Sequence, residues 1–296
     1  MEFFTIRAED KDKITKIIGD NPERICENTF GSMYTWSVND EYSYCIENKT
    51  LYFGLIDDKK ADFYFPIGYD NAKEAVDKLV SYCKEKNLQM CFSFLSSSQT
   101  EMLKEYFGQS IIIEEDRDWA DYLYNYEDLL RLKGKKYHGQ RNHINRFMRT
   151  YKNYEILPYD VSMHDETLEY LEKHFDNIKN PNKWLRDERR IMTTRLLPNY
   201  EKLGQLGAVL KVDNKIVAVT FGEIVGDTLY VHFEKATREY HGSYPMINKS
   251  FVKMCHGESL KYINREEDLG EPGLRTAKLS LQPCQIIPKS FAKVIF

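Results

Sequence analysis

Residues 206–234 constrain the fold more than any other segment, because they predict three strands joined by two tight turns. The strand-favouring β-branched and aromatic residues fill three consecutive runs: LGAVLKV (206–212), IVAVTFGEIV (216–225) and TLYVHFE (228–234). Asp213-Asn214 and Gly226-Asp227 separate the runs, and both pairs suit the tight turns of a hairpin. The pattern therefore predicts three consecutive antiparallel strands.

The rest of the chain mixes helix and strand signals. Further strands are predicted at 42–47, 51–56, 62–66, 89–95, 111–115 and 261–263. Helices are predicted at 71–86, from Ser98 to the residue before Gly108, and at 165–178, 184–197 and 244–260. Because both halves contain several strands beside helices, the sequence predicts a mixed α/β (α+β) fold.

The length of 296 residues exceeds that of one typical domain. We expect an N-terminal domain at 1–130, a basic connecting helix at 131–152 and a C-terminal domain at 153–296. Each domain is long enough to bury its own core.

The N-terminus and the cysteines predict a cytoplasmic protein. The first 13 residues lack the basic and apolar regions of a signal peptide. No apolar run approaches the ~18–20 residues of a membrane span. The six cysteines are scattered without a C-x-x-C pair, as reduced thiols usually are. There is no P-loop, H-E-x-x-H, G-x-S-x-G or cysteine–histidine cluster, so we expect no metal.

Residues 133–152 (KGKKYHGQRNHINRFMRTYK) hold seven positive residues and no acidic one, in a chain of net charge −4. From Gln140 onward the segment suits a helix, and Arg141, Asn145 and Arg149 would share one face. Such a face can hold phosphates. If RNA binds through about 4–6 phosphates, affinity should fall with salt at a log–log slope of roughly −3 to −4. The alternative is a solvated, lysine-rich connector.

Residues 264–278 interleave acidic and basic side chains between two short apolar pieces, 261–263 and 279–281. If both pieces are strands, this loop lies at the end of a sheet, where carboxylates and guanidinium groups can orient a nucleophile and hold negative charge. The alternative is a salt-bridge network that stiffens a surface loop.

Residues 234–244 follow the last strand of the predicted hairpin. Acetyltransferases that use CoA place an R/Q-x-x-G-x-G/A phosphate cradle at this point. Arg238 begins the pattern correctly, but His241 and Ser243 replace its two small residues. The predicted cradle is therefore incomplete.

Several motifs together resemble one bacterial family. They are WADYLY (119–124), LKGKKYH (132–138), RNHINRF (141–147), EKA (234–236), GSY (242–244), NREEDLG (264–270) and GLRTAKLS (273–280). In these motifs the chain is similar, over about residues 30–296, to the phosphatidylglycerol lysyltransferase C-terminal-domain family. The resemblance implies two tandem acetyltransferase-like (GNAT) domains, each a mostly antiparallel mixed sheet flanked by helices. It also implies kinship with enzymes that move an aminoacyl group from tRNA onto phosphatidylglycerol or onto peptidoglycan peptides.

On this basis the chain is predicted to be an acyltransferase that moves an aminoacyl group from aminoacyl-tRNA to a lipid, peptide or small-molecule acceptor. An aminoacyl ester is already activated, so no cofactor is required. A CoA-dependent N-acyltransferase, with CoA as donor, and a non-catalytic RNA- or partner-binding module are the alternatives. We expect no transmembrane segment, and a peripheral contact with a membrane surface stays open.

The prediction assigns roles to individual residues. Asp268, or alternatively Glu234, accepts the proton of the nucleophile, while Arg275 and Lys278 stabilise the oxyanion or the terminal phosphates of the tRNA. The predicted substrate-binding residues are Lys135, Lys136, Arg141, Asn142, Asn145, Arg146, Arg238, Tyr244 and Arg265.

Overall fold

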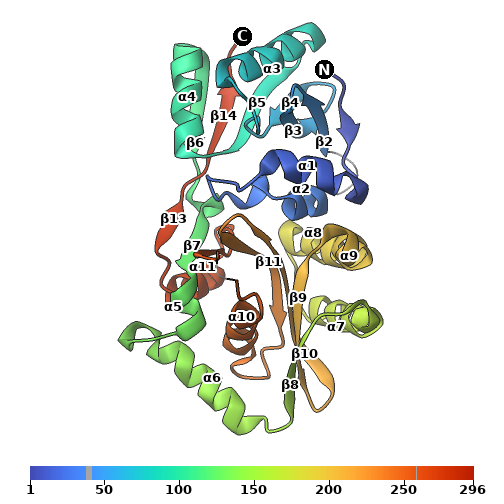
Figure 1. The fold of residues 1–296 in the computed structure, drawn as a ribbon, viewed down its shortest axis with the longest axis vertical. Coiled ribbons are helices and arrows are strands. Elements are labelled where there is room, and N and C mark those ends of the chain that lie inside the picture. The colour runs from blue at the N-terminus through green and yellow to red at the C-terminus, as the bar shows by residue number, and fades with distance from the viewer. Residues whose placement is uncertain (38–41, 258) are drawn as a thin grey trace. The chain divides into compact units, whose positions relative to one another are not determined.

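The computed structural model describes residues 1–37, 42–257 and 259–296, and the chain forms two compact units (Figure 1). The first unit contains Met1–Asp121, Glu267–Pro272 and Ile286–Phe296, and the second contains Tyr122–Glu266 and Gly273–Gln285. The chain therefore passes from one unit to the other more than once.

A seven-stranded sheet forms the centre of the first unit, in the order β1-β2-β3-β4-β5-β14-β6. All neighbours pair antiparallel except β4 and β5, which are parallel. The strands are β1 (Phe4–Thr5), β2 (Tyr42–Glu47), β3 (Thr50–Ile56), β4 (Lys60–Phe63), β5 (Gln89–Leu95), β6 (Ile111–Glu115) and β14 (Ser290–Val294).

The helices of this unit are α1 (Lys11–Ile18), α2 (Phe30–Trp36), α3 (Ala72–Lys86) and α4 (Ser97–Phe107). Helix α3 begins as predicted at Asn71, whose side chain accepts hydrogen bonds from the amides of Lys73 and Glu74. The predicted cap of α4 at Ser98 is wrong by two residues. Ser96 caps this helix, with Gln99 as its reciprocal partner, so the capping box lies two residues earlier.

The sheet of the second unit also has seven strands, in the order β13-β7-β12-β11-β10-β9-β8. Its strands are β7 (Asp121–Asn125), β8 (Tyr154–Pro158), β9 (Leu206–Val212), β10 (Lys215–Val225), β11 (Thr228–Ala236), β12 (Tyr262–Asn264) and β13 (Gln285–Ile287). The predicted double hairpin is confirmed, since β9, β10 and β11 pair antiparallel. Asp213 and Asn214 both have positive φ, at 49° and 60°, as their hairpin turn requires.

The second unit contains α5 (Tyr126–Arg131), α6 (His138–Thr150), α7 (His164–Asp176), α8 (Lys183–Ile191), α9 (Tyr200–Leu203), α10 (Ser243–Met254) and α11 (Pro272–Ser280). Figure 1 shows α10 on one side of strands β9–β11 and α7 on the other. Residues 279–281, treated above as a possible strand, are the end of α11 and the turn after it. That interpretation is therefore corrected, because 272–280 form a helix.

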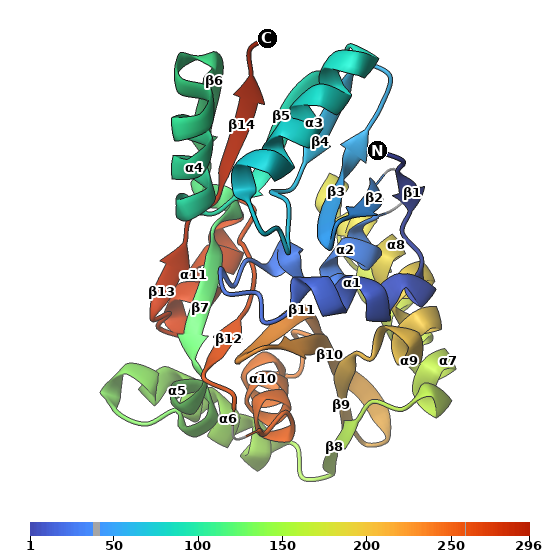
Figure 2. The same ribbon diagram turned by 45° about the horizontal axis from the view of Figure 1, so that its top comes forward.

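Each sheet includes one strand from the distant part of the chain. β14 lies between β5 and β6, and β7 lies between β12 and β13 (Figure 2). The two units therefore differ from the predicted division into 1–130, 131–152 and 153–296. The physical reason is backbone pairing, because the hydrogen-bonded ladders place β7 in the second sheet and β14 in the first.

The predicted mixture of two mostly antiparallel sheets with flanking helices is confirmed. Among the described residues, no helix is both long enough and apolar enough to span a bilayer.

Candidate active site

Strands β11 and β12 open away from each other in the second unit. They pair in parallel only over Thr228–Tyr230 and Tyr262–Asn264, while β11 continues to Ala236. The side chains that follow these register pairs include His232 and Glu234 on β11 and Arg265 and Glu266 after β12. The first sheet opens in the same way after Phe63 and Phe92, but aromatic rings follow there, with Tyr64 and Phe94 5.3 Å apart. The opening in the second sheet therefore has the chemistry expected of an active site.

Glu234 and Arg265 form an ion pair at this opening. Oε1 of Glu234 lies 2.9 Å from Nη2 of Arg265, and the Asn248 side chain on α10 donates to the same carboxylate at 3.5 Å. Burial lowers the pKa of Arg265, but the charge of Glu234 outweighs it and the pKa is raised. Within the described part of the chain, Nε and Nη1 of Arg265 are buried without a hydrogen-bond partner. Buried donors of this kind are costly unless a ligand or water satisfies them.

Lys278 reaches the same opening from α11. Its ammonium donates to the carbonyl oxygen of Arg265 at 2.6 Å and lies 5.7 Å from the ring centroid of Tyr122. The hydroxyl of Tyr124 donates to the Lys278 carbonyl at 2.8 Å. Predicted residues Glu234, Arg265 and Lys278 are thus brought together in one unit. Arg275 also lies on α11 and is half-buried.

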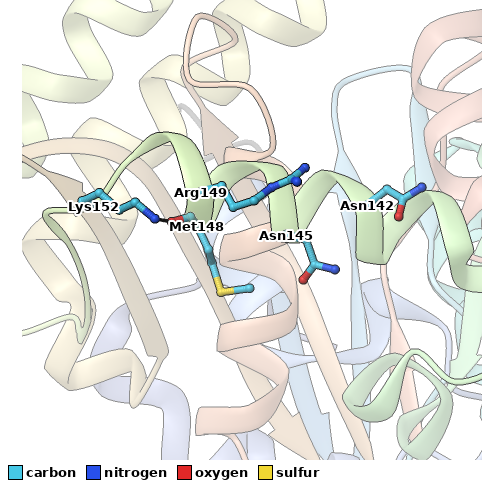
Figure 3. Close-up of a pocket in the computed structure, with 5 residues that line it drawn as sticks. All are labelled: Asn142, Asn145, Met148, Arg149 and Lys152. Carbon is cyan, nitrogen blue, oxygen red and sulfur yellow. Dashed lines mark hydrogen bonds between the residues drawn. The ribbon is translucent and has the colours of Figure 1, made fainter.

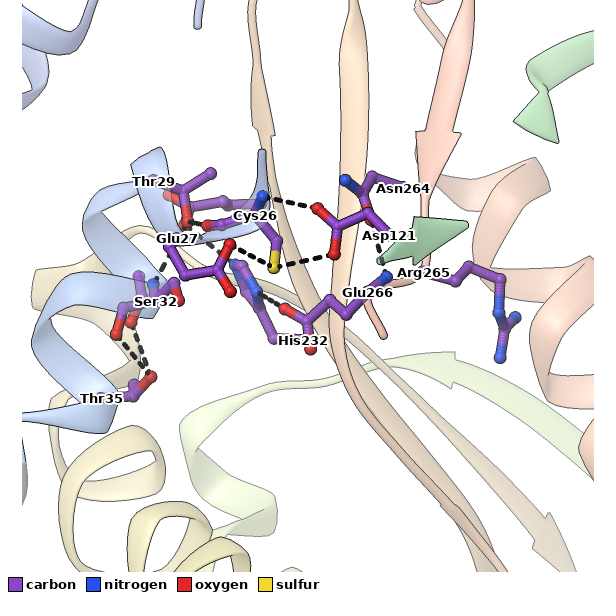
Figure 4. Close-up of polar contacts among 12 residues, drawn as sticks. Cys26, Glu27, Thr29, Ser32, Thr35, Asp121, His232, Asn264, Arg265 and Glu266 are labelled. Carbon is purple, nitrogen blue, oxygen red and sulfur yellow. Dashed lines mark hydrogen bonds and ion pairs between the residues drawn. The ribbon is translucent and has the colours of Figure 1, made fainter. Parts of the chain in front are cut away.

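His232 is a buried residue of this opening that the sequence analysis missed (Figure 4). Its Nδ1 lies 2.7 Å from Glu266 and its Nε2 lies 2.9 Å from Glu223. Burial alone would lower the pKa of His232, but the two carboxylates raise it to about 10. The imidazolium therefore holds both carboxylates at neutral pH. The sequence signal that could have identified it is that His232 and Glu223 lie in adjacent strands of the predicted hairpin.

Asp268 belongs to the first unit, where it holds a loop. Its side chain is fully buried, accepts a hydrogen bond from the Gly270 amide at 3.0 Å and lies 3.5 Å from Nη1 of Arg117. These contacts give Asp268 a structural role in the turn. Glu234, the alternative proton acceptor of the sequence analysis, is therefore the stronger candidate.

Part of the predicted phosphate-binding set stabilises the start of α6 instead. Arg141 donates to the carbonyl oxygens of Leu132 and Gly134, and Lys136 forms an ion pair with Asp128 at 2.9 Å. Other basic side chains of the segment are exposed, and these are Lys133, Lys135, Arg146, Arg149 and Lys152. The helix predicted from Gln140 onward is present as part of α6, and Arg141 and Lys136 make contacts within the protein.

One face of α6 borders an open hollow of about 560 Å³ (Figure 3). The residues that line it are Asn142, Asn145, Met148, Arg149 and Lys152. Asn142, Asn145 and Arg149 follow helical spacing and share this face, while Lys152 lies two residues beyond the end of α6. The two amides and two cations that line the hollow suit sugar and phosphate oxygens.

The loop before α10 packs against α6. The hydroxyl of Tyr151 donates to the Glu239 carbonyl at 3.2 Å, and the rings of Tyr151 and Tyr240 are 5.2 Å apart. A Cβ added to Gly242, whose φ is 91°, would lie 2.5 Å from the carbonyl oxygen of His143. Helix α6 therefore contacts the segment where CoA enzymes hold pyrophosphate. Arg238 is exposed on this loop, and Tyr244 lies in the first turn of α10.

A buried charged cluster in the first unit was also missed. The ammonium of Lys289 lies 2.7 Å from Asp121, 2.7 Å from Oε1 of Glu27 and 3.4 Å from the sulfur of Cys26. Burial raises the pKa of Glu27 to about 8, against the charge of Lys289. Cys26, Glu27 and Glu267 are close enough to share an ion, but an ion would compete there with the Lys289 ammonium.

Known proteins resemble this chain along almost its whole length. The family model described as "Phosphatidylglycerol lysyltransferase, C-terminal" matches residues 20–293. A conserved protein of unknown function from Bacteroides thetaiotaomicron is 35% identical, with a TM-score of 0.93 and 99% of each chain covered.

Two further solved structures have the same fold. The C-terminal domain of a putative lysylphosphatidylglycerol synthetase from Agrobacterium fabrum is 16% identical, with a TM-score of 0.71 over 97% of this chain and 92% of that one. A tandem GNAT protein from the clavulanic acid biosynthesis pathway is 9% identical, with a TM-score of 0.53 over 98% and 97%. The predicted tandem acetyltransferase-like architecture is thus confirmed.

Proposed function

The chain belongs to the phosphatidylglycerol lysyltransferase C-terminal family, and from this premise we propose that it transfers an aminoacyl group from an aminoacyl-tRNA to an acceptor. The family makes it an acyltransferase in the broad sense. The donor and acceptor are our proposal. The acceptor is a hydroxyl or amine on a lipid, a peptide or a small molecule.

The observation that carries this proposal is the Arg265 guanidinium at the sheet opening. It has two buried donors without a partner among the described residues, beside the carboxylate of Glu234. Acyl transfer needs both features, because a proton leaves the nucleophile while negative charge develops on the carbonyl oxygen. The pair offers an acceptor for the proton and donors for the oxyanion.

The reaction then follows from the chemistry of an ester. The acceptor oxygen or nitrogen attacks the ester carbonyl carbon, and its proton passes to Glu234. The carbonyl oxygen becomes an oxyanion, to which Arg265 and Lys278 donate. When the intermediate collapses, the bond to the terminal ribose oxygen breaks, and this oxygen takes up the proton. Glu234 returns to its carboxylate form, so no external cofactor is consumed.

The exposed face of α6 is proposed to hold the tRNA. Arg149 and Lys152 would contact phosphates, and Asn142 and Asn145 would contact sugar oxygens. Lys135 and Arg146 extend the same positive segment. Gln140 at the start of α6 donates to the Ser280 hydroxyl of α11 at 3.0 Å, so the RNA-binding helix touches the helix that carries Lys278.

Acyl-CoA is the competing donor. The contacts of Tyr151, Tyr240 and Gly242 count against it, because they involve the loop whose backbone would have to bind pyrophosphate. If acetyl-CoA shifts the melting temperature of the protein and charged tRNA does not, the hypothesis of a CoA-dependent N-acyltransferase is favoured.

The proposal is tested by incubating the protein with a pool of radiolabelled aminoacyl-tRNAs and scoring label in lipid, peptide and small-molecule fractions. We expect transfer with the wild type and at least a roughly hundredfold loss in Glu234→Gln and Arg265→Lys, because each removes a group used in the transition state. Glu166→Gln is the matched control, since Glu166 pairs with Lys211 at 2.5 Å. If the protein binds tRNA in a salt-sensitive way but transfers no aminoacyl group from any charged tRNA, it is a binding module and not a transferase.

A further inference from the structure

Strand β11 carries one extra residue where it pairs with β10, and that residue is His232. Val231 pairs with Gly222 on β10. Phe233 pairs with Phe221, the residue before Gly222, so two adjacent residues of β10 face three of β11. A bulge of this kind bends the strand and redirects a side chain. It therefore accounts for the position of His232, whose imidazole reaches both a carboxylate of β10 and one that follows β12.

These two carboxylates occupy both ring nitrogens of His232. Nδ1 lies 2.7 Å from Glu266 and Nε2 lies 2.9 Å from Glu223, and the His232 side chain is only 2% exposed. The ring thus has no nitrogen left with which to take a proton from a substrate. His232 can serve the proposed reaction only through the residues that it holds.

Glu266 lies in a strained backbone conformation directly after Arg265. Its φ is 60°, in the left-handed region that residues with a side chain rarely adopt. Its amide donates to the Asn264 side chain at 2.7 Å, its carbonyl oxygen accepts from the Tyr122 amide at 3.1 Å, and its carboxylate pairs with His232. Such strain persists only where the surrounding contacts impose it, so His232 helps to set the turn at Glu266.

The turn at Glu266 sends two neighbouring side chains in opposite directions (Figure 4). The Glu266 carboxylate points to His232. The Arg265 guanidinium points away from it and lies 2.9 Å from Glu234. The Arg265 carbonyl oxygen accepts from the Lys278 ammonium at 2.6 Å. A change in this turn would therefore move the guanidinium relative to both Glu234 and Lys278.

We propose that His232 is a positioning residue, which aims the Arg265 guanidinium at the reacting ester through its bridge to Glu266. The inference rests on the proposed function, in which Arg265 donates to the oxyanion. A displacement of about 1 Å at such a contact can slow a reaction by about a hundredfold. The bridge therefore serves the rate of transfer as well as the stability of the fold.

Single-turnover transfer tests this role, with the same pool of radiolabelled aminoacyl-tRNAs and the same acceptor fractions. His232→Gln should slow transfer about ten- to hundredfold and leave tRNA affinity in filter binding within about twofold, because only the transition state uses the aimed guanidinium. Glu266→Ala should have the same effect. Glu266→Gln keeps an oxygen for the imidazole and should stay within about threefold of the wild type.

Lys211→Met is the matched control. It also removes the cation of an ion pair, since Lys211 on β9 of the same sheet lies 2.5 Å from Glu166 and its side chain is 17% exposed. Its transfer rate should stay within about twofold of the wild type. Equal losses in Lys211→Met and His232→Gln would overturn the proposal, because they would reflect lost stability and not lost positioning.

A double variant shows whether His232 acts through Arg265. His232→Gln should cost less than about twofold in the Arg265→Lys background, because the group that His232 positions is already changed. Equal losses in the two backgrounds would refute the proposal, as would a wild-type rate in His232→Gln alone.

Crystal structures of the wild type and of His232→Gln give a readout that needs no activity. We expect the Arg265 guanidinium to leave its 2.9 Å contact with Glu234 in the variant. An unmoved guanidinium would refute the positioning role. A wild type that transfers no label would refute the proposed function alone. Should His232→Gln fail to fold, Glu266→Ala replaces it in each measurement.

Discussion

Nδ1 of His232 lies 2.7 Å from Oε1 of Glu266, and each residue stands two positions beyond Tyr230↔Asn264, the last register pair between β11 and β12. A side-chain bridge thus continues the backbone ladder where the strands diverge. The next residues along β11 lead to Glu234, which pairs with Arg265. Two side-chain bridges therefore fix the geometry of the opening in the second unit.

The first prediction concerns His232. In the folded protein its pKa is about 10, against an ordinary value of 6.5. Because the pKa of His232 is higher in the folded protein than in the unfolded chain, its protonated form stabilises the fold fully below pH 6.5. This stabilisation is lost as the pH rises through 10. His232→Leu should lower the free energy of unfolding by about 3 kcal/mol at pH 6, because it removes the cation that lies between the carboxylates of Glu223 and Glu266. Urea unfolding at pH 6 and pH 10 should show this difference shrinking, and an unchanged difference would contradict the ion pairs.

The second prediction concerns the buried ammonium of the first unit. Lys289→Met should destabilise the protein by about 3–5 kcal/mol, since the buried carboxyl groups of Asp121 and Glu27 lose this cation. Lys293→Met on the same strand is the control, because Lys293 is exposed, and it should change stability by less than about 0.5 kcal/mol. Chemical denaturation of both variants checks the pair. Equal effects would mean that the cluster contributes little.

The third prediction separates RNA contacts from structural contacts on α6. Arg149→Ala and Lys152→Ala should each reduce the slope of log affinity against log salt by roughly 1, because each removes one of the proposed phosphate contacts. Arg141→Ala should leave the slope unchanged and lower thermal stability instead, since Arg141 donates to the Leu132 and Gly134 carbonyls. Filter binding of tRNA at several salt concentrations measures the slopes. Identical slopes in all variants would remove α6 from the RNA-binding surface.

The fourth prediction concerns the irregular register of β10. A Cβ at Gly222 would lie 2.0 Å from the carbonyl oxygen of Tyr230, so Gly222→Ala must push two strands apart. We expect a loss of about 2–3 kcal/mol, as in other overpacked sites. Gly139→Ala on α6 meets no atom within 4 Å and should stabilise the helix by about 0.5–1 kcal/mol. Thermal unfolding of the two alanine variants distinguishes these effects by sign.

Local sequence signals predicted the parts of the fold that depend on neighbours in the chain. The turns at Asp213-Asn214 and Gly226-Asp227 and the cap at Asn71 are examples, because their geometry is set within a few residues. The placement of β7 and β14 could not be predicted in this way. Their partners lie more than a hundred residues away, and no periodicity encodes a pairing at that distance.

The same limit applies to the candidate site. Glu234, Arg265 and Lys278 were chosen from charge patterns, and the structure brings them together. The same reasoning assigned Arg141 and Lys136 to phosphate binding. In the structure, Arg141 donates to backbone carbonyl oxygens and Lys136 forms an ion pair with Asp128. Lys289 and His232 escaped notice because a buried charge becomes evident only when its partners from other strands are known.

The position of β14 between β5 and β6 also has a consequence for biosynthesis. This strand is translated after every other strand that the structure describes, yet it occupies the interior of the sheet that begins near the N-terminus. A nascent chain that has just completed β6 exposes two unsatisfied strand edges until the ribosome has made the whole second unit. The first sheet can therefore be completed only after β14 has been synthesised, so its folding waits for the residues of the second unit.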